Sequence, residues 1–195
     1  MAAADTDSNS KQAAILASGW QAFATYGFRK TSMEDIARGA GMSRPALYLH
    51  YRNKDDIYRH LVRQYYDDAV AAVEAALSDG GPVPERLAAA FAAQGGAAVE
   101  AMLTSPHGME LLDAGKSAAA EIIQQGEARL ASVYAAWLED AAQAGLLRLP
   151  GPATDLAATI AAALKGLKMT APDYPGYRAR VALLAAMIGD GLTGT

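Results

Sequence analysis

Helix caps and glycines follow one another closely between residues 27 and 58, and their spacing constrains the fold more than any other feature of the sequence. Gly27 ends a stretch with helical periodicity, and Thr31 with Glu34 fits a capping box. Gly41 then interrupts the chain just before Ser43, a second good N-cap. The pattern predicts two short helices joined by a three-residue turn, which is the plan of a helix-turn-helix.

The rest of the chain has helical rather than strand periodicity. Hydrophobic residues make up 52% of the sequence, and Ala, the best helix former, is frequent among them. Apolar residues recur at intervals of three and four, as at Leu87 and Phe91, and loops rich in Pro and Gly separate the stretches. We find no alternating strand pattern and no internal repeat. The sequence therefore predicts an all-α protein of about nine helices.

Charge is distributed unevenly along the chain. Residues 11–63 contain nine Lys or Arg and four Asp or Glu, a net charge of +5. Residues 64–195 contain eight basic and fifteen acidic residues, a net charge of −7, and two aspartates in the first ten residues bring the whole chain to −4. A basic N-terminal quarter on an acidic body is the asymmetry expected of a DNA-binding domain joined to one that does not contact DNA.

Several classes of protein are disfavoured by composition. The chain has no Cys and only three His, so we expect no disulfide, no metal site and no cofactor. Its first residues lack the basic and apolar regions of a secretory signal, and its apolar runs are shorter than a membrane span. We also find no phosphate loop, dinucleotide fingerprint or paired nucleophile and base. The expectation is a soluble cytoplasmic protein that is not an enzyme.

Residues 31–58 resemble the DNA-binding signature of the TetR/AcrR family of transcriptional regulators. The agreement in residue type and spacing extends over about residues 11–58, including Ile15, Leu16, Phe23, Gly27, Lys54 and Ile57. The resemblance implies an all-helical homodimer, in most members a repressor, whose C-terminal domain binds a small molecule that releases DNA. It divides the chain into a disordered tail over residues 1–9, a helix-turn-helix domain over 10–57 and an effector-binding and dimerisation domain over 58–195.

Base-reading and phosphate-binding roles follow for residues of the signature. Arg44 is the candidate for reading a base, because a guanidinium can bind O6 and N7 of guanine together. The helix starts at Thr31 and Ser43 offer N–H groups to phosphate. The remaining candidate DNA contacts, by matching position in the family or by apolar contact with thymine methyls, are Pro45, Ala46, Tyr48, His50 and Lys54.

The C-terminal part supplies candidates for ligand binding and pairing. A mostly apolar pocket is expected among large side chains on the helices that enclose the ligand in the family: Tyr65, Phe91, Met102, Met109, Tyr134 and Trp137. The last two predicted helices, about residues 154–169 and 174–192, are apolar nearly all round. A helix of this kind is buried, so we expect it to pack against the same helices of a second copy.

The predicted function is therefore a transcriptional repressor that a small, largely apolar ligand releases from its DNA operator. Two alternatives stay open from the sequence. One is an activator of the same family, because the sign of regulation depends on where the DNA site lies relative to a promoter. The other is a ligand-binding or scaffold protein whose helix-turn-helix does not read DNA.

Overall fold

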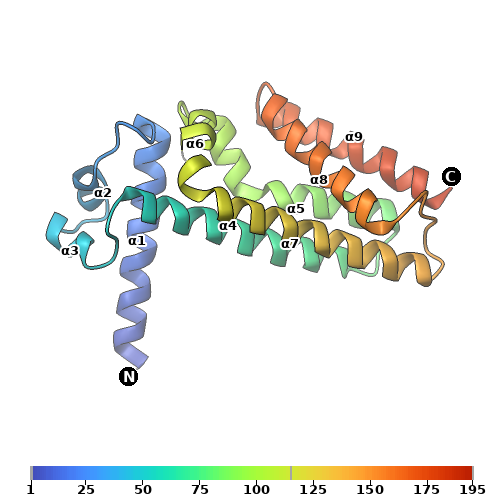
Figure 1. Ribbon diagram of the computed structural model, residues 1–195, viewed down its shortest axis with the longest axis horizontal. Helices are drawn as coiled ribbons and strands as arrows, with labels where there is room; N and C mark the ends of the chain where they lie inside the picture. Colours follow the sequence, from blue (N-terminus) through green and yellow to red (C-terminus); the bar gives the residue numbers. More distant parts are fainter. Residues whose placement is uncertain (1, 115, 195) are drawn as a thin grey trace. The chain divides into compact units, whose positions relative to one another are not determined.

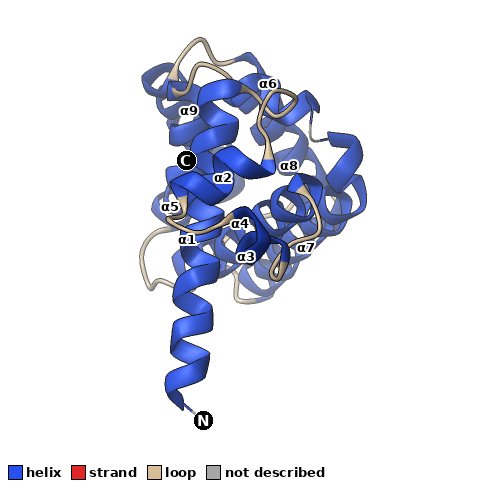
Figure 2. Ribbon diagram, turned by 90° about the vertical axis from the view of Figure 1, so that its left-hand side faces the viewer, coloured by secondary structure: helices blue, strands red, loops and turns tan. Residues whose placement is uncertain are grey.

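The computed structural model describes the backbone of residues 2–114 and 116–194, which forms nine helices joined by short loops (Figure 1). No strand occurs in these two ranges, as Figure 2 shows, so the all-α prediction is confirmed. The helices are α1 (Ala2–Tyr26), α2 (Met33–Gly39), α3 (Arg44–Tyr48), α4 (Lys54–Leu77), α5 (Val83–Thr104), α6 (Gly108–Ala114), α7 (Lys116–Gln143), α8 (Ala153–Thr170) and α9 (Tyr174–Thr193).

The chain forms two compact units that differ from the domains expected from the sequence. Unit 1 comprises residues 1–64 and 104–123, and unit 2 comprises residues 65–103 and 124–195. The predicted boundary after residue 57 places residues 104–123 in the C-terminal domain, whereas they pack into unit 1. The backbone is also helical from Ala2, ahead of the start expected at residue 10, in a segment rich in Ala.

An aromatic cluster explains why residues 104–123 belong to unit 1. The rings of Phe23, Phe28 and Tyr58 lie with their centroids 5.1–6.2 Å apart, all three buried. The Tyr58 hydroxyl donates a hydrogen bond to the carbonyl of Leu111 on α6 at 3.2 Å. Burial raises the pKa of this hydroxyl to about 12, so Tyr58 remains a neutral donor at physiological pH.

Unit 2 is built on long helices with a second core. On α5, Leu87 and Phe91 are fully buried, and the Phe91 ring meets Tyr134 of α7 with centroids 5.8 Å apart. By length and composition α5 could cross a membrane, but its large side chains pack into this core. The helix is kinked at Gly96, whose φ of +51° favours glycine.

Helices α4 and α7 approach closely at Gly126, which is buried on α7 against the ring of Tyr66. A Cβ atom added at Gly126 would lie closer to the ring atoms than the van der Waals contact distance allows. The ring of Tyr66 is buried and has little room to move. We expect Gly126→Ala to lower the free energy of unfolding by about 1–3 kcal/mol, the usual cost of overpacking a core. Urea denaturation followed by circular dichroism measures this change.

Gly166→Ala is the matched control, because Gly166 lies inside α8 and an added Cβ meets nothing within 4 Å. Its expected effect has the opposite sign, a gain of up to about 1 kcal/mol from helix propensity. Equal effects of the two substitutions would show that the approach of α4 and α7 does not limit side-chain size at Gly126.

Candidate functional site

The start of α2 is capped one residue later than the sequence predicts. The Ser32 hydroxyl accepts from the backbone N–H of Asp35 at 3.2 Å, and the Asp35 carboxylate accepts from the N–H of Ser32 at 3.0 Å. These two bonds form a capping box, and the hydrogen bonds from Ser32 lower the pKa of Asp35. The predicted pair of Thr31 and Glu34 is therefore displaced by its neighbours in the sequence.

Thr31 has a different task in the structure. Its side chain is only 2% exposed, and its hydroxyl lies within hydrogen-bonding distance of the carbonyls of Gly27 at 2.9 Å and Ala22 at 3.1 Å. The hydroxyl thus ties the turn after α1 to the last turns of that helix. Almost no surface of Thr31 is left with which to contact DNA.

The third helix presents the predicted recognition residues to solvent. Ser43 caps it as predicted, accepting from the N–H of Ala46 at 3.3 Å, and Pro45 lies in its first turn. Leu47 is fully buried and anchors α3 to the core of unit 1. Ser43, Arg44 and Pro45 are exposed, and Ala46 is partly exposed.

Arg44 and Tyr48 form a pair on the exposed side of α3. The guanidinium donates to the Tyr48 hydroxyl at 3.3 Å and lies 5.6 Å from the centre of its ring. This contact orders an exposed, flexible side chain without burying it. His50 is exposed just beyond the helix, and Leu49 beside it is 86% exposed. No signal in the sequence marks Leu49 as exposed, because leucine at a helix end is usually core.

Lys54, predicted to bind the DNA backbone, is engaged within unit 1. Its ammonium donates to the carbonyls of Phe28, Arg29 and Thr31 at 2.7, 2.9 and 2.9 Å. It also lies 5.0 Å from the centre of the Phe28 ring. An ammonium has three donors, and all three are used here. A phosphate contact would require Lys54 to give up one of these bonds.

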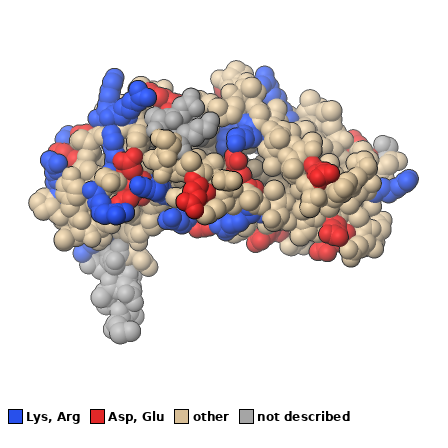
Figure 3. Space-filling model, viewed as in Figure 1, with Lys and Arg blue, Asp and Glu red and all other residues tan. Residues whose placement is uncertain are grey.

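Basic side chains gather over unit 1 on the left of Figure 3. Some of these charges are locally compensated: Arg52 donates to Asp56 at 2.9 Å, and Arg38 pairs with Asp35 at 3.2 Å. Arg44, in contrast, makes no ion pair among the described residues. Its charge is therefore available to an anionic or electronegative partner.

Unit 2 contains a cavity of about 350 Å³ between α4, α5, α7, α8 and α9. This volume falls at the lower end of the range for small-molecule sites. The cavity is lined by Tyr65, Tyr66, Gln94, Glu127, Leu130, Ala131, Ala158, Ala161, Ala162, Leu164, Lys165, Lys168 and Tyr177.

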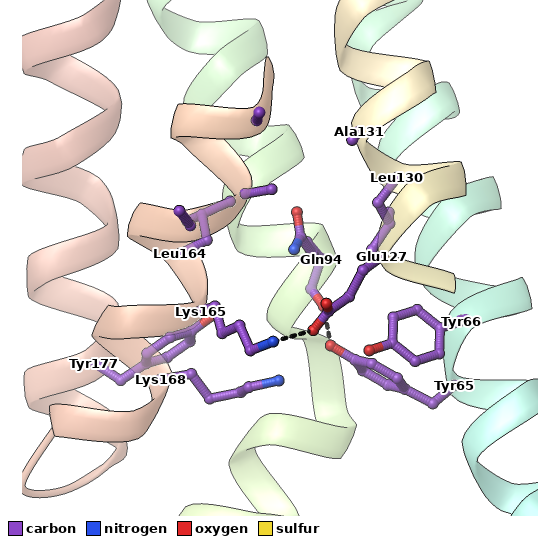
Figure 4. A pocket seen from close by; sticks show the side chains of 13 residues that line it. Tyr65, Tyr66, Gln94, Glu127, Leu130, Ala131, Leu164, Lys165, Lys168 and Tyr177 are labelled. Atoms are coloured by element: carbon purple, nitrogen blue, oxygen red, sulfur yellow. Dashed lines mark hydrogen bonds and ion pairs between the residues drawn. The ribbon is translucent and has the colours of Figure 1, made fainter. Parts of the chain in front are cut away.

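The charged groups and the tyrosine rings of the cavity lie together at one end, below the leucines and Ala131 in Figure 4. Lys165 and Glu127 form an ion pair at 2.6 Å. The Lys168 ammonium lies 5.7 Å from the centre of the Tyr65 ring, and the Tyr65 hydroxyl donates to the carbonyl of Gln94 at 3.2 Å. Burial is the main cause that lowers the pKa of Lys168, and Lys165 lowers it further while Glu127 opposes the shift.

The six predicted pocket residues have different positions. Tyr65 lines the cavity, and the hydroxyl of buried Tyr134 donates to Oε1 of the lining residue Gln94 at 2.9 Å. Phe91, Met102 and Trp137 lie in unit 2 but do not line the cavity, and Met109 belongs to unit 1. Phe91 and Met102 are buried in the core, and Trp137 lies against Arg86.

The charged residues of the cavity were missed from the sequence. Their signal is on α8, where Ala158, Ala161, Lys165 and Lys168 follow at intervals of three or four and so share one face of the helix. Two lysines on the face of a helix that lines an interior cavity are unusual. For metals, the parts of the chain described hold no group of three His, Asp or Glu side chains able to bind an ion.

Residues 15–61 match the family of bacterial regulatory proteins named tetR. The transcriptional activator FasR of Mycolicibacterium smegmatis is 32% identical over 79 residues, which cover 40% of this chain and 36% of FasR. The transcriptional regulator RutR of Escherichia coli is 32% identical over 75 residues, covering 38% and 35%. This chain thus matches little more than a third of the length of these relatives.

Similarity in fold extends much further along the chain. The structure of SmeT, the repressor of a multidrug efflux pump in Stenotrophomonas maltophilia, matches with a TM-score of 0.69 at 20% identity, covering 94% of each chain. The fatty acid degradation regulator FadR of Bacillus halodurans matches with a TM-score of 0.70 at 16% identity, covering 93% of this chain and 96% of FadR. Residues 15–61 therefore carry the sequence pattern of the tetR family of bacterial regulatory proteins, and over nearly its whole length the chain is similar in fold to SmeT and FadR.

Proposed function

We propose that the protein is a sequence-specific transcriptional repressor that acts as a homodimer in the cytoplasm and leaves its DNA operator when a small molecule occupies unit 2. The observation that carries the proposal is the arrangement of α3, which is capped and held to the core by buried Leu47. On this helix Arg44 is exposed and forms no ion pair among the described residues. Such a helix fits the major groove, where its first residues meet base edges.

Readout of DNA follows from the chemistry of the exposed residues. Arg44, ordered by Tyr48, is suited to bidentate binding of guanine, and Ala46 and Pro45 are suited to contact with thymine methyls. Ser43 at the helix start, Tyr48 and His50 are placed to contact phosphates. We assign Lys54 and Thr31 a positioning role, because both hold the turn between α1 and α2.

Ligand control is supported by the cavity of unit 2 and by the fold. A solved structure of similar fold is a complex of SmeT with triclosan, which matches with a TM-score of 0.67. We place the ligand in the cavity lined by Tyr65 and Lys168 rather than among Phe91, Met102 and Trp137. Helix α4 supplies both Lys54 and Tyr65, so it gives a continuous element through which occupancy can act on the DNA-binding unit.

Pairing is proposed through α8 and α9. Leu183 and Met187 of α9 are 62% and 66% exposed, and Met169 at the end of α8 is 42% exposed. Leu183 and Met187 are four residues apart and so share one face of α9, and a contiguous exposed apolar patch marks a surface that a partner covers. A second copy of the same helices would bury them in a two-fold interface, which also places two α3 helices on one DNA site.

A second candidate function is activation, which is favoured by the name of the relative FasR, a transcriptional activator. An activator and a repressor share the DNA-binding geometry proposed above. A reporter gene placed behind the recovered site separates them, because loss of the protein raises expression from a repressed promoter and lowers it from an activated one. No catalytic role is proposed.

Selection of bound DNA from a random pool tests the proposed function directly. A two-fold dimer with a helix-turn-helix should recover two related half-sites in opposite orientation, about 34–36 Å apart between centres. Log affinity should fall with log salt at a slope of about −0.9 for each phosphate neutralised. Recovery of sequences without a shared half-site would contradict sequence-specific binding and would favour the scaffold alternative.

Arg44→Ala tests base readout. It should relax the preference at one base pair in each half-site by about 1–3 kcal/mol, while affinity for random DNA changes little. Competition titrations with single-base variants of the site measure the preference. Arg52→Ala is the control, because the Arg52 guanidinium is exposed and already bound to Asp56. An equal loss on specific and random DNA would move Arg44 to the class of phosphate contacts.

Lys54→Met tests whether Lys54 positions the turn or binds phosphate. Removing the ammonium leaves three carbonyls without their donor, so we expect the free energy of unfolding to fall by about 1–3 kcal/mol. Affinity should weaken on all DNA sequences with the salt slope unchanged. Lys30→Met, at an exposed position, should leave stability unchanged. A slope that becomes shallower by about 0.9 with normal stability would restore the phosphate role.

A further inference from the structure

The cavity of unit 2 has two chemically different ends. Helix α8 contributes both, with Ala158, Ala161 and Ala162 towards its start and Lys165 and Lys168 towards its end. From Ala158 to Lys168 the helix axis advances about 15 Å, at 1.5 Å per residue. A cavity with an apolar wall at one end and charged groups at the other fits a ligand that is itself apolar with one polar head.

The charges at the polar end do not cancel. Lys165 and Glu127 neutralise each other at 2.6 Å, and the cavity lining holds one further charged residue, Lys168. Within the described chain Lys168 donates no hydrogen bond and forms no ion pair, and its ammonium lies over the face of Tyr65. Lys168 is partly buried, so its charge is less well solvated than that of an exposed lysine, and this end of the cavity favours a negative charge.

Other polar atoms of the cavity lining also offer donors. The Gln94 side chain uses its oxygen to accept from Tyr134, and its amide nitrogen makes no bond to any described residue. The Tyr177 hydroxyl, which lies beside Gly95, likewise donates to none of the residues described. Burial raises the pKa of Tyr177, so it remains a neutral donor. An ammonium, an amide and a hydroxyl together suit an acceptor that carries charge.

We propose that the ligand of this cavity is a monoanion with a compact apolar body, whose carboxylate or equivalent head group binds Lys168. This inference rests on the proposed function. The volume of about 350 Å³ limits the body to a small molecule. A neutral amide of the same shape would leave the Lys168 charge uncompensated, and an ammonium head group would be repelled by it. The site therefore selects on charge before shape.

Matched probes test the selection on charge. Benzoate, 2-naphthoate and 4-biphenylcarboxylate, each with its neutral amide, are titrated into the full-length protein by calorimetry. We expect at least one acid to bind more than tenfold tighter than its amide, since a hydrogen bond between charged groups is stronger than one between neutral groups. Amides that bind as tightly as their acids, or no binding by any acid, would overturn the proposal.

Two variants that should change acid binding in opposite directions test whether Lys168 binds the head group. Lys168→Met should remove the preference for the acid and leave amide binding unchanged, whereas Glu127→Gln should strengthen acid binding several-fold by freeing Lys165. Arg129→Met removes an equal charge from an exposed position of unit 2 that does not line the cavity. It should change the binding of neither the acid nor the amide. If Lys168→Met fails to fold, the gain in Glu127→Gln still decides, and an unchanged acid preference there would contradict the proposal.

DNA binding is measured separately with the selected operator, without probe and then with the acid. Loss of operator affinity on adding the acid supports both the ligand class and the switch. Specific operator binding together with failure of all acids overturns the ligand class and leaves the DNA-binding function standing. Acid preference without any specific DNA binding supports the ligand class and overturns the proposed DNA-binding function.

Discussion

The bonds of Lys54 determine how the helix-turn-helix is held. The Lys54 ammonium, at the start of α4, donates hydrogen bonds to three carbonyls of the segment between α1 and α2, and it lies against the ring of Phe28. These carbonyls point into a turn where no helix partner is available, so without the ammonium they would need water or another donor. Lys54 therefore helps to set the direction in which the chain enters α2.

Thr31 supports the same segment from inside. Its hydroxyl is bound near the carbonyls of Gly27 and Ala22, and Gly27 itself has a φ of +80° that lets α1 stop abruptly. Both residues match the family signature, and both were assigned roles from the sequence. Agreement with a family motif therefore does not separate the residues proposed to contact DNA from residues that build the domain. Exposure separates them: Arg44 and Tyr48 are exposed, while Thr31 is buried.

Local signals in the sequence predicted most of the fold. The cap at Ser43, the stop at Gly27 and the turn at Gly41 depend on neighbouring residues only, and the structure confirms each of them. The membership of α6 in unit 1 could not be predicted in this way. It depends on a hydrogen bond between Tyr58 and Leu111 and on the aromatic cluster, which join residues far apart in the chain.

The same distinction explains why the cavity was predicted incompletely. Large apolar side chains drew attention to Phe91 and Tyr134, yet large apolar side chains fill cores best, and these two pack against each other. A cavity forms where side chains are small or too polar to pack, as with the alanines and lysines of α8. A lysine that faces the interior of an apolar helical unit costs stability unless its charge is used. The presence of Lys168 beside an ion pair that is already neutral is therefore explained by the anionic ligand proposed for the cavity.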